Sequence, residues 1–138
     1  MIALVDSSVI ARLLLGEPNP LQEWEHITRA YASRLVLLEL GRLIDRLRLS
    51  SSIDDTQVVQ LHQELKRVID SIDLLAMTEQ VLQLAGGPMP TQLGSLDAIH
   101  LASAIELQRH LATPVGIATH DLQLARASRA MGMEVWGV

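Results

Sequence analysis

Four acidic residues of this chain stand at positions where their chemistry needs an explanation: Asp6, Glu39, Asp97 and Asp121. Hard divalent cations such as Mg²⁺ and Mn²⁺ prefer oxygen ligands, and four carboxylates can seat one such ion, or two when a substrate phosphate is also bound. The chemistry that this set supports is activation of water for in-line attack on a phosphodiester. We expect the four to be both the metal ligands and the catalytic residues, because no nucleophilic side chain is needed.

Glu39 gives the clearest physical signal. It interrupts the leucine-rich run RLVLLELGRLIDRLR, which predicts a mostly buried helix over residues 34–48. A buried carboxylate without a partner takes up a proton or requires a cation, a metal ion or a strong hydrogen bond. The alternative is an ion pair within the helix with Arg42, three residues further on.

The other three acids lie near expected element ends. Asp6 directly follows the apolar run IALV, and Asp121 comes two residues after VGIAT. Ligands of open parallel α/β sheets bind beyond the carboxyl ends of the strands, which favours a site role for both. Helix capping is the alternative for both, and the helix dipole explains equally well why Asp97 stands in a first helical turn.

Hydroxyl groups flank two of the acids. Ser7 and Thr119 are placed to bond a metal-bound water or a phosphate, with capping as the alternative. For Ser8 we favour the capping role, at the helix that follows Asp6.

Two histidines and two arginines complete the candidates. His100 is expected to belong to the core, and His120 to be exposed. Arg42 and Arg46 follow Glu39 on the same helical face and could receive an RNA backbone, although a solvated face or internal salt bridges explain them as well.

Strands and helices alternate along the chain. This pattern predicts an α/β fold with a central, mostly parallel sheet and helices on both faces, in one domain over residues 1–138. Strands are expected at 2–5, 72–77, 115–119 and around EVWGV at the end. Helices are expected at 8–15, 20–30, 34–48, from the SSIDD segment to about 69, at 78–85, at 96–109 with Ser95 as its cap, and at 121–131.

The composition excludes several classes of protein. The absence of cysteine rules out disulfides and thiolate metal sites, and a net charge of -5 argues against a protein that coats nucleic acid. A nuclease remains compatible with that charge, because a bound metal supplies the positive charge that phosphate meets. With neither a signal-peptide pattern nor a membrane-length apolar run, we expect a cytoplasmic protein.

Four motifs together resemble the PIN-domain ribonucleases, and particularly the VapC toxins of prokaryotic toxin-antitoxin modules. They are LVDSSVIARLLLGEP, LLELGRLIDRLR, LGSLDAIHLASAIEL and IATHDLQLARASRAMGMEV. The resemblance covers nearly the whole chain and implies that Asp6, Glu39, Asp97 and Asp121 form the metal site. It also implies Mg²⁺ or Mn²⁺ dependence, cleavage of RNA, a homodimer, and inhibition by a VapB-type antitoxin.

Two positions depart from the family pattern. Ser7 stands where threonine is more frequent, which keeps the hydroxyl, and His120 is unusual before the last acid. Two other functions also fit the sequence: a catalytically weak module of the same fold that acts as a binding or scaffold unit, and a metal-dependent nuclease or phosphatase for another phosphate ester. Binding of Mg²⁺ and a comparison of RNA, DNA and phosphomonoester substrates distinguish them.

Overall fold

The computed structural model describes the whole chain, residues 1–138. No helix is long and apolar enough to cross a membrane. The strands are β1 (Ile2–Val5), β2 (Arg29–Ser33), β3 (Asp73–Leu75), β4 (Gly116–Ala118) and β5 (Val135–Trp136). The helices are α1 (Ser7–Leu14), the 3₁₀ helix η1 (Gln22–His26), α2 (Leu35–Leu49), α3 (Asp55–Ile69), α4 (Glu79–Ala85), α5 (Ser95–Leu111) and α6 (Leu122–Ala130).

The five strands form one sheet in the order β3-β2-β1-β4-β5, and all neighbouring pairs are parallel. This confirms the predicted α/β class. After β1 the chain builds the β2-β3 side of the sheet, and it then returns to β4 on the other flank of β1. The crevice between the carboxyl ends of β1 and β4 is therefore the place where such sheets bind ligands.

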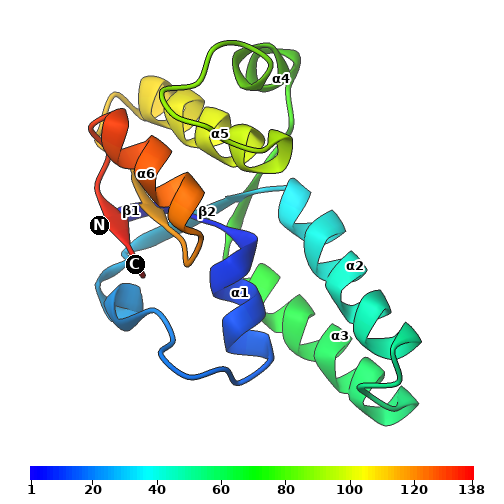
Figure 1. Cartoon of the computed structure of the whole chain (residues 1–138). Coiled ribbons are helices and arrows are strands. Elements are labelled where there is room, and N and C mark those ends of the chain that lie inside the picture. The colour runs from blue at the N-terminus through cyan, green and yellow to red at the C-terminus, as the bar shows by residue number, and fades with distance from the viewer.

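Helices cover both faces of the sheet (Figure 1). Successive strand residues point to opposite faces, so Leu4 packs with residues of α5 and α6, whereas Val5 packs with residues of α1, α2 and α3. Helices α2 and α3 pack side by side in antiparallel directions, and α4 lies against α5. The two apolar clusters fix the sheet between its helices and hold the ends of β1 and β4 in place.

The predicted helix over residues 20–30 is wrong. This segment contains the short helix η1, and its last residues begin β2, whose sequence is RAYAS. Alanine favours a helix locally, but β2 lies between β1 and β3, where Tyr31 and Ala32 are buried on opposite faces. Tertiary pairing therefore overrides local propensity.

One predicted cap is also wrong. Gly94, rather than Ser95, is the residue that precedes α5, and no side chain caps that helix end. The remaining predicted elements are present, with ends that differ by a few residues.

Candidate metal centre

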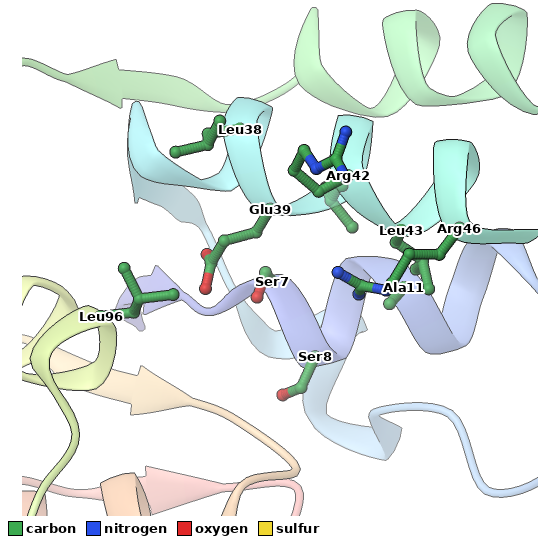
Figure 2. A pocket seen from close by; sticks show the side chains of 10 residues that line it. Ser7, Ser8, Ala11, Leu38, Glu39, Arg42, Leu43, Arg46 and Leu96 are labelled. Carbon is green, nitrogen blue, oxygen red and sulfur yellow. The ribbon is translucent and has the colours of Figure 1, made fainter.

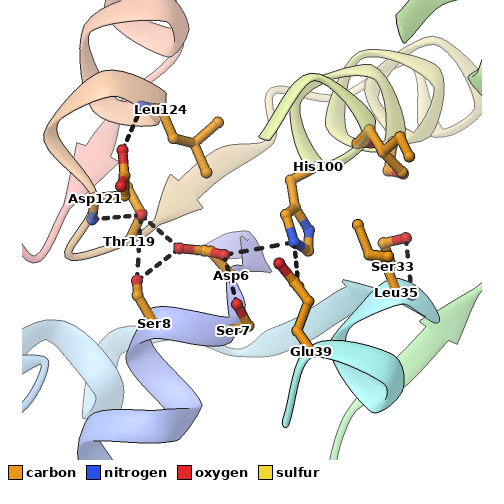
Figure 3. Close-up of polar contacts among 12 residues, drawn as sticks. Asp6, Ser7, Ser8, Ser33, Leu35, Glu39, His100, Thr119, Asp121 and Leu124 are labelled. Carbon is orange, nitrogen blue, oxygen red and sulfur yellow. Dashed lines mark hydrogen bonds and ion pairs between the residues drawn. The ribbon is translucent and has the colours of Figure 1, made fainter. Parts of the chain in front are cut away.

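Asp6 lies at the carboxyl end of β1 and is buried. One of its oxygens, Oδ2, accepts hydrogen bonds from Ser8 Oγ at 2.6 Å and from Thr119 Oγ1 at 2.8 Å (Figure 3). The other oxygen, Oδ1, has only long contacts, to Ser7 Oγ at 3.3 Å and to a histidine nitrogen at 3.5 Å. One side of the carboxylate is thus fixed, and the other side faces the crevice.

The two hydroxyl groups donate to Asp6 because each of them already accepts a hydrogen bond from a backbone N–H. Ser8 Oγ accepts from the backbone N–H of His120 at 2.9 Å, and Thr119 Oγ1 accepts from that of Asp121 at 2.9 Å. Each hydroxyl carries a single proton, which is therefore free to be donated to Asp6. Two donated hydrogen bonds to the same oxygen fix the orientation of the Asp6 carboxylate.

The same contacts decide what the hydroxyl residues do. Ser8 lies inside α1 and supports Asp6, so its predicted capping role is wrong. Thr119 is completely buried, and its hydroxyl holds Asp6 and the following turn rather than a phosphate. Ser7 stays beside Asp6, where its hydroxyl lines a cleft.

Glu39 points from α2 toward Asp6, and its side chain is 18% exposed. Its Oε2 lies 2.8 Å from Nε2 of His100. The alternative of an ion pair with Arg42 is wrong, because Arg42 bonds Asp45 at 2.9 Å instead. Glu39 is thus retained in a partly buried position by a partner from a different helix.

His100 is the candidate site residue that the sequence reasoning missed. It is completely buried, as expected of a core residue, but its Nε2 lies between two carboxylates, 2.8 Å from Glu39 and 3.5 Å from Asp6. Since both neighbours are acceptors, this nitrogen carries a proton. Burial lowers the pKa of His100, but the hydrogen bond to Glu39 and the charge of Asp6 outweigh it and raise that pKa. The signal was present in DAIH, because Asp97 and His100 share a helix face at i, i+3.

Asp97 lies at the start of α5 and is partly buried. Burial raises its pKa from 3.8 to about 6, and the charges of Asp121, Asp6 and Glu39 add to the rise. Like charges disfavour ionisation in this way only when they lie near one another. The four predicted acids therefore share one electrostatic environment, which we call the acid cluster.

Asp121 has a structural role in addition. Its Oδ1 accepts hydrogen bonds from the backbone N–H groups of Gln123 and Leu124, so it caps α6. The alternative considered for this residue is therefore correct, yet its Oδ2 makes no hydrogen bond within the chain. Capping and a place in the acid cluster are compatible for the same side chain.

The tightest group of metal-capable atoms consists of Asp6, Glu39 and His100, whose ligand atoms lie within 4.8 Å of one another. Asp97 and Asp121 lie outside this group; the charge of Asp97 acts on His100, and that of Asp121 acts on Asp97. The weakly bonded Oδ1 of Asp6, a second carboxylate close by and two further acids suit a hard divalent cation. The residues present therefore fit a metal ion of that kind.

His120 is partly buried, so the expectation that it is exposed is wrong. Its Nδ1 lies 2.7 Å from the carbonyl oxygen of Gly137, while Nε2 is buried without a partner. The ring thus packs under the C-terminal segment, and the residue meets the centre through its backbone N–H to Ser8.

A cleft of about 430 Å³, which we call the arginine cleft, adjoins the acid cluster (Figure 2). Glu39 is part of the acid cluster and also lines this cleft. The lining residues are Ser7, Ser8, Ala11, Leu38, Glu39, Leu40, Arg42, Leu43, Arg46 and Leu96. Both arginines that the sequence singled out therefore lie beside the candidate centre.

A parallel sheet with acids gathered at its switch point is an arrangement suited to metal-assisted chemistry on phosphate esters. The family model described as PIN domain matches residues 3–129. The chain belongs to the PIN domain family.

Two curated relatives come from Mycobacterium tuberculosis. The chain is 30% identical to "Ribonuclease VapC47" over 130 residues, which cover 93% of this chain and 90% of the relative. It is 30% identical to "Ribonuclease VapC46" over 139 residues, which cover 95% and 93%.

Solved structures share the fold. VapBC2 from Rickettsia felis, bound to a promoter DNA fragment, has a TM-score of 0.69 at 13% identity and covers 99% of both chains. VapBC-1 from nontypeable Haemophilus influenzae has a TM-score of 0.62 at 16% identity, with 98% and 96% covered.

Proposed function

We propose that this protein is a metal-dependent endoribonuclease of the VapC type, formed by residues 1–138 as one domain. The observation that carries the proposal is the carboxylate of Asp6, which is fixed through Oδ2 and lies close to the carboxylate of Glu39 at the switch point of the sheet. The relatives named as VapC ribonucleases support the choice of RNA as the substrate.

Asp6, Glu39, Asp97 and Asp121 would hold the cation, with Mg²⁺ as the first candidate and Mn²⁺ as the second. A cation bound there supplies positive charge to a phosphodiester and lowers the pKa of water for in-line attack. Ser8 and Thr119 orient the carboxylate of Asp6. A bound cation would also favour the ionised form of Asp97, which burial and the neighbouring acids oppose.

A VapB-type antitoxin is the proposed protein partner. The structural neighbours titled as VapBC complexes support this, and so do two exposed apolar side chains at the cleft, Leu38 and Leu96. We also propose a homodimer. Light scattering on the isolated chain and co-purification with the product of a neighbouring short reading frame test these two assemblies.

The activity is tested with a labelled single-stranded RNA in Mg²⁺, in Mn²⁺ and in excess EDTA. The wild-type chain is expected to cleave it only with metal present. Asp6→Asn is expected to abolish cleavage, whereas the matched variant Asp55→Asn, an exposed acid at the start of α3, retains it. Equal cleavage by wild-type protein and Asp6→Asn would assign the activity to a contaminant.

The same assay separates the other two functions considered. A binding or scaffold module would bind metal or RNA without cleaving it. An enzyme for another phosphate ester would cleave single-stranded DNA or a phosphomonoester in preference to RNA.

A further inference from the structure

The two arginines of the arginine cleft differ in what they already bind. Arg42 is held by Asp45 at 2.9 Å, and Asp45 also accepts from Arg48 at 2.8 Å. The side chain of Arg46 makes no hydrogen bond or ion pair within the chain, although it lines the same cleft. In a protein of net charge -5, this leaves a free guanidinium beside an acid cluster.

The side chain of Arg46 also points toward the acid cluster. It lies seven residues after Glu39, which is two helical turns, or about 10 Å along the axis. Side chains on a helix lean toward its N-terminus, so Arg46 leans back toward Glu39. Figure 2 shows its guanidinium beside Ala11, extended in the direction of Ser7. The guanidinium therefore lies closer to the acid cluster than its backbone does.

The floor of the cleft leaves room for a chain molecule. Along α1 it consists of the small side chains of Ser7, Ser8 and Ala11. A strand that enters the acid cluster can continue over this floor to Arg46 without meeting a large side chain from α1.

We propose that Arg46 binds a backbone phosphate of the RNA strand next to the phosphate that is cleaved. This inference rests on the proposed function and names a substrate contact for it. A guanidinium forms paired hydrogen bonds with phosphate oxygens, which an ammonium group does not match. RNA is favoured over a peptide because it carries a negative charge at every nucleotide. One charge can face the bound cation and a neighbouring one Arg46.

The test compares Arg46→Ala with Arg67→Ala, which removes another exposed arginine without a side-chain partner, located on α3 and outside the cleft. The probe is a fluorescent single-stranded RNA, and its anisotropy is titrated with the full-length protein at several KCl concentrations. Ca²⁺ replaces Mg²⁺ to fill the acid cluster, and a gel after each titration checks that the RNA is intact. Mn²⁺ affinity of each variant is measured in parallel by calorimetry.

Arg46→Ala is expected to weaken RNA binding about fivefold, the effect of one exposed ion pair. It should also reduce the slope of log affinity against log salt by about 0.7, the value for one single-strand phosphate contact. Arg46→Lys should restore the slope but only part of the affinity, and Arg67→Ala should change neither. Mn²⁺ affinity should be the same in all variants.

Three results would overturn the proposal: an unchanged salt slope in Arg46→Ala, equal losses in Arg46→Ala and Arg67→Ala, or weaker binding of the antitoxin with RNA binding intact. The last would assign Arg46 to the antitoxin that we propose at the same cleft, and not to RNA. A wild-type chain that binds neither Mn²⁺ nor RNA would instead contradict the proposed function itself.

Discussion

Thr119 Oγ1 donates a 2.8 Å hydrogen bond to Asp6 Oδ2, between residues 113 positions apart in the chain. Thr119 directly follows β4 and Asp6 directly follows β1, so the bond joins the two strands at the switch point. It also leaves Oδ1 as the oxygen of Asp6 that has only long contacts, to Ser7 at 3.3 Å and to His100 at 3.5 Å. A contact inside the buried core thus sets the geometry of the proposed metal ligand.

Thr119→Val tests this contact, because valine keeps the shape and removes the hydroxyl. The variant loses the bond to Asp6 and leaves the backbone N–H of Asp121 without its acceptor. We expect the free energy of unfolding to fall by about 1–3 kcal/mol, the cost of unsatisfied buried polar groups. Urea denaturation measures the loss, and a Mn²⁺ titration should show weaker binding.

Ser128→Ala is the control for Thr119→Val. Its buried hydroxyl only donates to the carbonyl oxygen of Leu124 in the same helix, where the helix ladder already supplies a donor. We expect a smaller loss of stability and unchanged Mn²⁺ affinity. Equal effects of the two substitutions would mean that Thr119 contributes only as a buried side chain.

Asp97→Asn tests the repulsion within the acid cluster. The pKa of Asp97 is about 6 in the folded protein against 3.8 for the free side chain. A raised folded-state pKa stabilises the fold below 3.8, and this contribution is lost as the pH rises through about 6. In EDTA, we therefore expect Asp97→Asn to melt above the wild-type protein at pH values over about 6, and the difference to shrink toward acid pH.

The same variant should lose RNA cleavage, since the amide is a weaker ligand for a hard cation. Thermal melting over a pH series with EDTA, and then with Mg²⁺, measures both effects. If the melting difference stayed constant with pH, the charge of Asp97 would not be the cause.

His100 is expected to act on metal through Glu39. Its Nε2–H holds Glu39 Oε2 at 2.8 Å, which leaves the other oxygen of that carboxylate available. His100→Leu should weaken Mn²⁺ binding about 10- to 100-fold, as loss of a group that orients a ligand does. His100→Gln can place an amide N–H near the same point and should recover part of the affinity. Calorimetric titration measures both.

A double-mutant comparison separates this role from direct ligation. If His100 works through Glu39, then His100→Leu should have little further effect in a Glu39→Ala background. A full additional loss there would make the imidazole a ligand in its own right.

The charge state of His100 adds a pH dependence of its own. Its raised pKa means that its pairing with Glu39 stabilises the metal-free fold below pH 6.5, and that this contribution is lost as the pH rises through the folded-state value. Metal binding stabilises a folded protein by mass action. Hence the increase in melting temperature on addition of Mg²⁺ should be larger at alkaline than at weakly acidic pH. An increase independent of pH would contradict the pairing.

The sequence indicated the sheet and the acids, because those depend on local patterns. Apolar runs marked β1 and β4, and Glu39 was conspicuous because it interrupts a buried leucine face. Strand β2 was missed because RAYAS has no strong strand signal; its pairing with β1 and β3 determines its conformation.

The partners of the site residues were less predictable than the residues themselves. Capping explains Asp121 correctly, yet its charge also acts on Asp97. Thr119 and His100 take their roles from residues more than 60 positions away, Asp6 and Glu39 respectively. Ser8 supports its near neighbour Asp6, but its hydroxyl is oriented by the distant backbone N–H of His120. Such contacts depend on the packing of three elements, which a local motif does not specify.

Substitution of Gly116 tests how tightly the edge strand β5 packs against β4 beside the site. A Cβ built on Gly116 of β4 would lie 2.1 Å from the ring of Trp136 on the neighbouring strand β5, so the indole occupies the space that any side chain would need. Gly116→Ala should destabilise the fold by about 1–3 kcal/mol, the usual cost of overpacking. The matched change Gly41→Ala, in α2, meets no atom within 4 Å. It should stabilise by up to about 1 kcal/mol, because alanine favours a helix. Urea denaturation followed by Trp fluorescence measures the free energy of unfolding of both variants. We expect the two substitutions to change it in opposite directions. Equal stabilities would mean that Trp136 moves freely, and that β5 does not hold the chain that leads from Thr119 to Asp121.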